Sequence, residues 1–582
     1  MKRMILLAPC VMLFTILFAQ DLSYSTEGNN YFSEAVIPVT GTAGEWKTLR
    51  QPVMVSFASS NRRYDKEKVP LKKTQENWSA TAWKGEKVHT QLLVWTNQPI
   101  TAVTYTLSPL VNEKSQSIPS PNINAGFVRY VITDEFAGGC GYRKPADFDS
   151  SLAADAIDII QAIPVKANNV QPIWLSVKIP REAAAGNYKG SISVKADKTY
   201  TSHYTIKVIG RILPPPAEWT FDLDLWQHPA AIARVHGVPL WSDEHFELMR
   251  PYYTLLAGAG QKNITASIMD EPWGHQTYDD FPGLIKWTKH KDGSWTYDYS
   301  LFDQYISFVM SCGINKRINC YTMVPWALSF RYFDEAAGKD TTLKAPIGSA
   351  EYTAHWTGML KDFTQHLKNK GWFDITSIAM DERPVKDMQV VIELLKSIDA
   401  GWKIALAGNY HPEIEKDIFD YCLASNLQFD EALLKERIAE GKPSTYYTCC
   451  VEPYPNGFTF SPPAEHVWIG WYAAAKGFTG YLRWAYNSWV ADPLRDSRFR
   501  SWPAGDTYQV YPGPRTSIRF EKLVEGIQDF EKIKLLQKAF TAKGDAASLK
   551  KLDKVLQQFA IEKLKTVPAE EMIQQAKQLL NE

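Results

Sequence analysis

The stretch DITSIAMDERPVKDMQVVIELLKSIDAG, residues 374–401, decides the fold prediction because it joins two different hydrophobic patterns. It begins with a short apolar run, typical of a buried strand, that ends at an Asp-Glu pair followed by Pro384. It continues with apolar residues at helical spacing and ends at Gly401, as many amphipathic helices do. Strand, loop and helix in this order form the repeating unit of α/β folds.

Seven further strand candidates surround this unit between residue 221 and residue 489, and helical stretches separate several of them. Eight strands that alternate with helices predict a (β/α)8 TIM-type barrel, which we assign to residues 216–541. The sixth candidate has the weakest pattern. The eight are FDLDLWQHP (from Phe221), NITASIMDEP (Asn263), RINCYTMVPW (Arg317), DITSIAMDERP (Asp374), KIALAGNY (Lys403), FDYCLASN (Phe419), STYYTCCVEPYP (Ser444) and FTGYLRWAYNSW (Phe478).

The sequence before the barrel has a different hydrophobic pattern. Short alternating runs such as KVHTQLLVWT and YKGSISVKAD, rich in β-branched and aromatic residues, predict an all-β sandwich over residues 20–215. The proline-rich LPPPAEW at 213–219 is the natural linker to the barrel. The amphipathic residues 542–582 predict a short C-terminal helical extension. We therefore expect a multidomain protein.

The first 19 residues have the pattern of a signal peptide. Lys2 and Arg3 precede the apolar run Met4–Phe18, and Ala19 offers a small residue before a cleavage point. No later segment has the pattern of a membrane span, so we expect export to a periplasm or the extracellular space. The oligomeric state stays open.

Composition and motifs exclude several classes of function. Lys+Arg and Asp+Glu both number 64, so nothing builds the basic field that nucleic acids or anionic membranes attract. After Cys10, six cysteines remain without a CxxC pair, which indicates neither a disulfide scaffold nor a zinc site, although export would permit a single bridge. The chain lacks G-x-S-x-G, HExxH, GxGxxG and P-loop motifs. We expect no metal and no cofactor.

The polar and aromatic residues that follow the predicted strands are the candidate site, because barrel enzymes place their chemistry at the C-terminal ends of the strands. They are carboxylates, amides, tyrosines and indoles, the residue types of a carbohydrate site, and the chain contains 20 Trp, 28 Tyr and 26 Phe. The candidates are His228, Asp270, Glu271, Trp326, Asp381, Glu382, Asn409, Tyr447, Glu452, Trp484, Asn487 and Trp489.

Two of these strand ends carry the same Met-Asp-Glu sequence, at 269–271 and 380–382. Adjacent acids suit glycosidic-bond cleavage because their repulsion raises the pKa of one acid and keeps it protonated as a donor. Neighbours on a regular strand face opposite ways, so such a pair works jointly only where the strand breaks into its loop. The fourth strand often holds the acid/base in sugar-cleaving barrels. We therefore predict that Asp381 and Glu382 are catalytic and that Asp270 and Glu271 form a pocket wall at most.

The chain resembles glycoside hydrolase family 123, the β-N-acetylgalactosaminidases. The resemblance rests on the order of sandwich and barrel, and it covers nearly all of the mature chain. The segments that carry it are IAMDERP (378–384), GYLRWAYNSW (480–489) and GDTYQVYPGPRTSIRFEKLVEGIQDFE (505–531).

The resemblance implies a retaining mechanism in which the substrate's own 2-acetamido group is the nucleophile and forms an oxazolinium-type intermediate. Asp381 would hold the acetamido N–H, and Glu382 would act as general acid and then as general base. From strand-end position alone, we expect Trp326, Trp484 and Trp489 as an aromatic wall and Tyr447 as the group that orients the carbonyl. Tyr446 is adjacent to Tyr447, so only one of the two should face the barrel mouth.

Other interpretations stay open at this point. Glu452 follows the seventh strand, where ordinary retaining barrels place a nucleophile, so Glu382 and Glu452 could form a covalent-intermediate pair. The sugar could be N-acetylglucosamine, which differs only at the C4 hydroxyl. The chain could also be a non-catalytic glycan-binding protein. Asn409, Asn487 and His228 have structural alternatives as turn-capping and loop residues, and the tryptophans as core residues.

Overall fold

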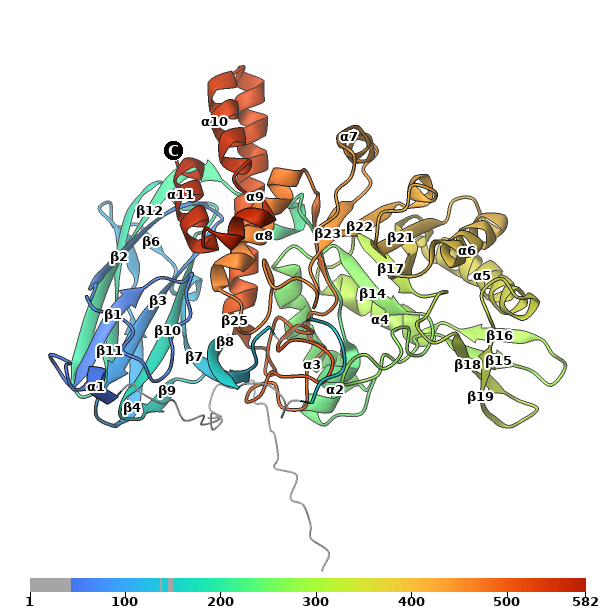
Figure 1. Ribbon diagram of the computed structural model, residues 1–582, viewed down its shortest axis with the longest axis horizontal. Helices are drawn as coiled ribbons and strands as arrows, with labels where there is room; N and C mark the ends of the chain where they lie inside the picture. Colours follow the sequence, from blue (N-terminus) through green and yellow to red (C-terminus); the bar gives the residue numbers. More distant parts are fainter. Residues whose placement is uncertain (1–42, 137–138, 145–149) are drawn as a thin grey trace, which may run out of the picture.

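The computed structural model describes residues 43–582 except 137–138 and 145–149. The predicted signal peptide, residues 1–19, lies outside the described residues. A β-sandwich and a barrel lie on opposite sides of a group of C-terminal helices (Figure 1). No described helix combines the length and the apolar character that crossing a membrane requires.

The N-terminal region is a sandwich of two mainly antiparallel sheets. The six-stranded sheet has the order β1 (Val53–Ala58), β3 (Lys87–Thr96), β10 (Asn169–Lys178), β7 (Ile123–Thr133), β8 (Ser151–Ile157) and β25 (Thr516–Ser517). The seven-stranded sheet contains β2 (Asn77–Lys84), β12 (Thr199–Ile212), β11 (Gly186–Lys195), β4 (Ile100–Leu107), β9 (Ala162–Val165), β5 (Leu110–Asn112) and β6 (Ser117–Ile118). The short helix α1 (Ala43–Trp46) precedes them.

Alternation of apolar residues builds the core between these sheets. Leu92 and Val94 of β3 share one buried cluster with Ile192 and Val194 of β11. β12 alternates buried and exposed positions, as a strand with one solvated face does. β3 is buried almost throughout, because other parts of the chain cover the second face of the six-stranded sheet. The sandwich is therefore one layer of a larger body.

The second region is a nearly closed barrel of eight parallel strands, and all eight predicted strands are present. From the second strand to the eighth, each strand pairs with the next in chain order, and the first strand pairs with the eighth. The gap lies between the first two strands, which share only an isolated bridge from Leu223 to Gln261. The strands are β13 (Asp222–Leu225), β14 (Asn263–Ser267), β17 (Arg317–Tyr321), β20 (Thr376–Met380), β21 (Lys403–Gly408), β22 (Asp420–Ala424), β23 (Ser444–Tyr447) and β24 (Gly480–Arg483).

Helices cover the outside of the barrel, so that strands such as β20 are buried on both faces. α5 ends at Lys370, and Gly371 directly after it has the left-handed conformation that often ends a helix. α6 differs from the prediction, because it ends at Ile398 and Asp399 already has an extended backbone. The helices are α2 (Pro229–His236), α3 (Asp243–Ala257), α4 (Ser300–Ser311), α5 (Ala350–Lys370), α6 (Val385–Ile398), α7 (Glu431–Ala439) and α8 (Pro463–Lys476).

Two hairpins that the sequence patterns did not predict form a separate four-stranded sheet beside the barrel (Figure 1). They are inserted in the loops after β14 and β17. Their strands are β15 (Lys286–Lys289), β16 (Trp295–Asp298), β18 (Ser329–Asp334) and β19 (Lys339–Lys344).

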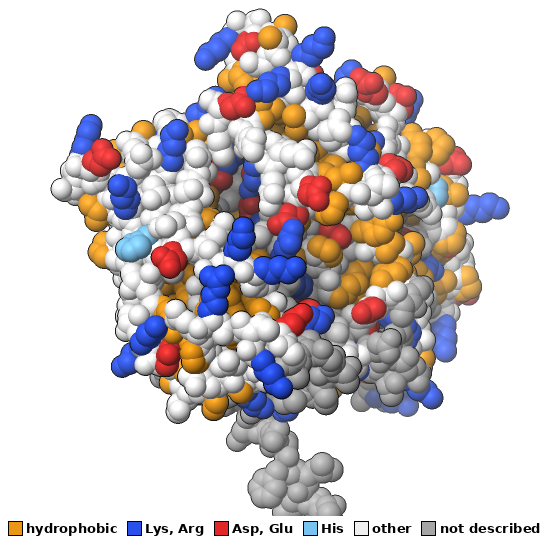
Figure 2. All heavy atoms as spheres, turned by 60° about the vertical axis from the view of Figure 1, so that its left-hand side comes forward, with side chains coloured by type: hydrophobic (Ala, Val, Ile, Leu, Met, Phe, Trp, Pro, Cys, Tyr) orange, Lys and Arg blue, Asp and Glu red, His pale blue; other side chains and the backbone are white. Residues whose placement is uncertain are grey.

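The C-terminal helices join the two regions. α9 (Ile518–Lys543) is almost entirely buried along its first two-thirds and packs against α8. It runs through residue 541, the boundary that the sequence predicts for the barrel domain. β25, directly before α9, extends the sandwich sheet by pairing with β8. α10 (Ala546–Leu556) and α11 (Ala569–Leu580) complete the helical extension. On the sandwich-facing side of the molecule, Figure 2 shows positive and negative side chains scattered over the surface.

Candidate active site

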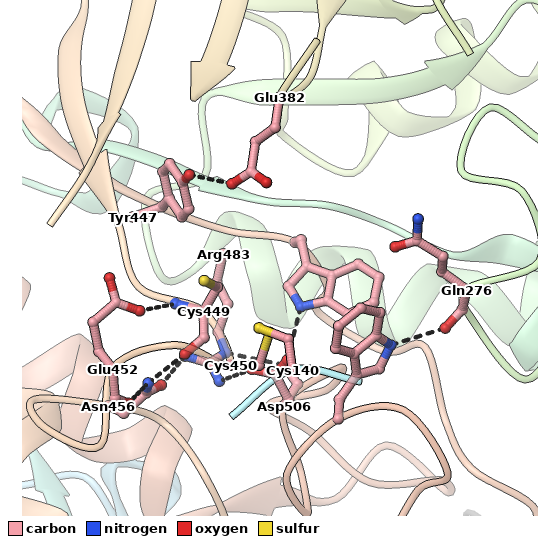
Figure 3. Close-up of a disulfide and its surroundings, with 12 residues drawn as sticks. Cys140, Gln276, Glu382, Tyr447, Cys449, Cys450, Glu452, Asn456, Arg483 and Asp506 are labelled. Carbon is pink, nitrogen blue, oxygen red and sulfur yellow. Dashed lines mark hydrogen bonds and ion pairs between the residues drawn. A yellow bond between two sulfur atoms is a disulfide. The ribbon is translucent and has the colours of Figure 1, made fainter. Parts of the chain in front are cut away.

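A cavity of about 290 Å³ lies at the C-terminal ends of the barrel strands. This volume is at the small end of the roughly 300–1,000 Å³ found for ligand pockets. Figure 3 shows part of its lining, with Glu382 and Tyr447 on one side and a disulfide on the other. The lining residues are Cys140, Trp226, Trp273, Gln276, Trp326, Asp381, Glu382, Ala407, Tyr447, Thr448, Cys449, Cys450, Val451, Leu482, Trp484 and Trp502.

The floor of the cavity is aromatic and buried. Trp226 follows β13 and is 2% exposed, and Trp273 follows β14 and is 3% exposed. Their ring centroids lie 5.1 Å apart in a tilted arrangement. The small side chain of Ala407, from the same buried cluster, also lines the cavity. Flat indole faces and a small volume suit a single sugar ring.

The predicted catalytic pair borders this cavity. Asp381 and Glu382 follow β20 directly, where the strand breaks into its loop, and both side chains reach the cavity. Asp381 Oδ2 accepts a hydrogen bond of 3.2 Å from Trp326 Nε1, and Asp381 Oδ1 accepts one of 2.9 Å from the Glu382 N–H. The Tyr447 hydroxyl donates to Glu382 Oε1 (Figure 3). Each acid therefore has its own fixed partner.

Two side chains at the site, Asp381 and Tyr447, have pKa values above their ordinary ones. Burial, followed by the adjacent charge of Glu382, raises the pKa of Asp381 to about 6. The sequence predicts a raised pKa on the acid that donates the proton, with repulsion as the cause, but the raised pKa is that of Asp381, and desolvation is its larger cause. Burial and the Glu382 carboxylate raise the pKa of Tyr447 well above its usual value, so this hydroxyl stays a hydrogen-bond donor.

Adjacent Tyr446 and Tyr447 point to opposite sides, as expected from strand geometry. Tyr447 joins the cluster inside the barrel, whereas Tyr446 packs outside it and donates to the Ile469 carbonyl at 2.8 Å. The hydroxyl of Tyr447 contacts the acid/base candidate itself in this structure.

Trp484 and Trp502 form an aromatic wall of the cavity, and a buried ion pair holds Trp484 in place. Trp484 Nε1 donates to Asp506 Oδ2 at 3.1 Å, and Asp506 Oδ1 lies 2.6 Å from Arg483 Nη2. The Trp484 ring meets Trp502 edge-on at 5.1 Å, and Trp502 Nε1 donates to the Gln276 carbonyl at 2.9 Å (Figure 3). Asp506 and Arg483 are both 1% exposed, so this charged support is shielded from solvent.

A disulfide completes the lining. Cys140 comes from the segment between β7 and β8 of the sandwich, and Cys450 from the loop after β23. The free thiol of Cys449 lies close to both sulfur atoms, so these three cysteines form a group with metal-ligand spacing, but two of them are already bonded to each other. A second such group, Glu271, His275 and Asp280, is a hydrogen-bonded loop cluster.

Three residues predicted as substrate contacts are buried and hydrogen-bonded to other parts of the chain. The structure places Trp489 in the core, where its Nε1 donates to the Val510 carbonyl at 2.7 Å. Asn487 is fully buried and exchanges two hydrogen bonds with the backbone of His228, at 3.0 and 2.9 Å. The His228 ring stacks on Phe281 with centroids 3.6 Å apart, and burial lowers its pKa to about 3. None of the three lines the described cavity.

Asn409 and Glu452 also lie away from the cavity lining. Asn409 has an exposed side chain, and its carbonyl accepts a 2.9 Å hydrogen bond from Tyr421. Glu452 Oε1 accepts a hydrogen bond from Ser425 at 2.6 Å, and its Oε2 accepts one from the Cys449 N–H at 2.9 Å. The second of these is visible in Figure 3. Glu452 holds its loop in place.

The first Met-Asp-Glu pair organises a loop. Glu271 Oε2 accepts the His275 N–H at 2.6 Å, and Glu271 Oε1 accepts the Phe281 N–H. Asp270 Oδ1 accepts the Gly283 N–H at 2.7 Å. Neither acid lines the cavity, but Trp273 of the same segment does.

Sequence reasoning missed several lining residues. Trp226 lies in the first predicted strand stretch, and its place directly after the alternating residues 221–225 was the signal that could have identified it. Trp502, Gln276 and the Cys140–Cys450 bridge come from long loops or from the other domain, where strand-end position gives no signal.

Models of one known protein family match both regions of the chain. The family model described as glycoside hydrolase 123, catalytic domain, matches residues 226–536. The glycoside hydrolase 123 N-terminal domain model matches residues 57–196. No curated protein matched the chain.

Among solved structures, a family 123 glycoside hydrolase from Clostridium perfringens is 29% identical, with a TM-score of 0.82. The match covers 91% of this chain and 97% of that one, and that enzyme is described as hydrolysing glycolipid glycans. A Bacteroides ovatus GH5 xyloglucanase matches at 8% identity over 81% of this chain and 100% of that chain, but its TM-score of 0.28 carries no argument. The chain therefore belongs to glycoside hydrolase family 123 and is a glycoside hydrolase.

Proposed function

We propose that this glycoside hydrolase is an exo-acting, retaining β-N-acetylgalactosaminidase that uses the substrate's 2-acetamido group as its nucleophile. One observation carries the proposal: among the described residues that line the cavity, Asp381 and Glu382 are the only carboxylates, and they are neighbours in the chain. Hydrolysis with retention needs an acid/base and a nucleophile. Both acids come from the one loop after β20, whereas the covalent route needs two carboxylates that flank the bond, and this supports the substrate as the nucleophile.

The proposed reaction has two steps. The acetamido carbonyl oxygen attacks the anomeric carbon while the bond to the leaving oxygen breaks, and Glu382 gives its proton to that oxygen. Asp381 accepts a hydrogen bond from the acetamido N–H and offsets the positive charge that develops there. Glu382 then takes a proton from water, whose oxygen attacks the same carbon and opens the oxazolinium ring. Two inversions give net retention.

The contacts of the two acids support these roles. Asp381 is desolvated and held by the Trp326 indole, so its orientation is set before the substrate binds. Glu382 is solvent-exposed and held by a tyrosine hydroxyl, which suits a group that exchanges protons with water. The indoles of Trp226 and Trp273 form an apolar floor for the sugar ring.

The covalent alternative receives less support. It requires Glu452 as nucleophile, yet the Glu452 side chain does not line the described cavity, and its carboxylate binds Ser425 and the Cys449 N–H instead. The N-acetylglucosamine alternative remains open, because no cavity residue can be assigned to the C4 hydroxyl. The Clostridium perfringens relative is described as hydrolysing glycolipid glycans, and we propose that terminal β-linked GalNAc on such glycans or on other oligosaccharides is the substrate.

We also propose export by the N-terminal signal. The charged and apolar pattern of residues 1–19 supports it. The Cys140–Cys450 disulfide is compatible with an oxidising compartment.

The test is hydrolysis of an aryl β-N-acetylgalactosaminide with and without a galactose-configured thiazoline that mimics the cyclic intermediate. We expect turnover that the thiazoline blocks competitively. Turnover that ignores the thiazoline, together with a sugar ester trapped on Glu452, would establish the covalent route instead. Faster turnover of the glucose-configured substrate would reassign the sugar.

A further inference from the structure

The disulfide makes the N-terminal domain part of the cavity wall. Cys140 and Cys450 are 310 residues apart in sequence, and both line the cavity. Figure 3 shows the bridge across from Glu382, and Trp484 and Trp502 line the same cavity. A covalent link between domains at this position acts directly on the space that the substrate enters.

The lining divides into a buried floor and an exposed rim. Trp226, Trp273 and Tyr447 are at most 7% exposed, whereas Trp326 is 40% and Val451 is 65% exposed. Cys140 and Glu382 are also exposed. Because Glu382 must reach the glycosidic oxygen, the bond that breaks lies at the level of the rim. The terminal sugar then occupies the floor, and the leaving group lies against the rim.

The N-terminal domain also fixes the loop that carries Trp502. The Ile132 N–H of β7 donates to the Arg495 carbonyl at 2.8 Å, and the Gly141 N–H donates to the Ser501 carbonyl at 3.1 Å. Asp134 Oδ1 accepts the Ala504 N–H at 3.0 Å. Hydrogen bonds from the sandwich therefore hold residues 495–504 on both sides of the indole, just as the disulfide holds the loop that presents Val451.

We infer that the Cys140–Cys450 bridge, Val451 and Trp502 form a leaving-group subsite, through which the N-terminal domain selects glycans with a second sugar. The inference rests on the proposed function, because it uses Glu382 as the proton donor. Sulfur, valine and indole surfaces are apolar, and they match the apolar face of a sugar ring next to the cleaved bond. The subsite makes the sandwich a determinant of specificity.

The test compares two substrates of the same terminal sugar. One is methyl β-N-acetylgalactosaminide, whose methanol leaving group is too small to contact the rim. The other is a disaccharide in which GalNAc is β-linked to galactose. Cys449→Ser serves as the parent enzyme, because it prevents the free thiol from forming a new bridge. Cys140→Ser in that parent opens the disulfide, and Val451→Ser keeps the bridge and changes only an exposed side chain.

For opening the disulfide we expect kcat/KM on the disaccharide to fall about tenfold relative to the parent, the usual size of a lost apolar contact, while the methyl glycoside changes little. Val451→Ser should lower only the disaccharide value, by a smaller factor, and it tests the subsite even if the open variant folds poorly. Equal changes on both substrates, or none on either, would overturn the subsite. A parent enzyme that hydrolyses neither substrate would instead overturn the proposed function, and the inference with it.

Discussion

The two Met-Asp-Glu segments occupy equivalent places after barrel strands, yet they do different work. In the loop after β14, Glu271 and Asp270 accept backbone N–H groups and hold the loop closed. In the loop after β20, Asp381 and Glu382 are bound by the side chains of Trp326 and Tyr447 and face the cavity. The same three letters therefore give a structural pair and a candidate catalytic pair.

The partners explain the difference. Each oxygen of Glu271 accepts a backbone N–H of its own loop, so a change at this carboxylate also disturbs the loop. Glu382 is exposed and accepts one side-chain hydrogen bond from Tyr447, which leaves lone pairs for substrate and water. Glu271 has an additional constraint, because its backbone lies in the left-handed region at φ 53°.

The largest expected effect is a loss of catalytic activity that occurs when the second pair is changed but not when the first pair is changed. Glu382→Gln removes the proton that the leaving oxygen needs, and we expect kcat to fall by about 10²–10⁴-fold. Glu271→Gln, the matched change in the first pair, should keep activity within the same order of magnitude. Steady-state kinetics on an aryl β-N-acetylgalactosaminide gives both values. Equal losses in the two variants would contradict the assignment.

The pH dependence sharpens the comparison further. Asp381 must be ionised to offset positive charge, and its pKa is raised to about 6. Below pH 6, kcat/KM should therefore fall about tenfold for each pH unit. The indole of Trp326 stabilises the ionised form, so Trp326→Phe should move this limb to higher pH, and Asp270→Asn should leave it in place. A wild-type limb near the ordinary carboxyl pKa of about 4 would show that Asp381 is not the titrating group.

Glu271 of the first pair should contribute more to the free energy of unfolding than Glu382 of the second pair. Glu271→Gln turns an amide NH₂ toward a backbone donor, and we expect the free energy of unfolding to fall by about 1–3 kcal/mol. Glu382→Gln changes a solvent-exposed side chain and should leave the free energy of unfolding nearly unchanged. Urea denaturation followed by tryptophan fluorescence measures both. A larger loss in Glu382→Gln would reverse the structural assignment.

The smallest effect is expected at Glu452, which neither pair contains. Because its carboxylate binds Ser425 and the Cys449 N–H, Glu452→Gln should have nearly wild-type turnover. Intact-protein mass spectrometry of the wild type during turnover should show no sugar adduct on this residue. Loss of activity together with such an adduct would restore the covalent alternative.

Strand patterns predicted the eight barrel strands because parallel strands are buried on both faces and therefore contain mainly apolar residues. They also placed Asp381, Glu382 and Tyr447, which lie at or next to strand ends. Residues farther along the loops could not be placed. His228 and Asn487 follow strands too, but they satisfy each other, a pairing across 259 positions that no local pattern reveals. Cys140 reaches the cavity from the other domain, and Trp502 comes from a long loop and contacts Gln276, which is far away in the sequence.

The most direct test of the central claim is the dependence of kcat/KM on the leaving group in Glu382→Gln and Asp381→Asn. 2,4-Dinitrophenolate departs without a proton, whereas methanol needs one. If Glu382 is the general acid, Glu382→Gln should lose far less activity on the dinitrophenyl β-N-acetylgalactosaminide than on the methyl glycoside, and Asp381→Asn should lose similarly on both. An equal loss on both substrates in Glu382→Gln would contradict its role as proton donor.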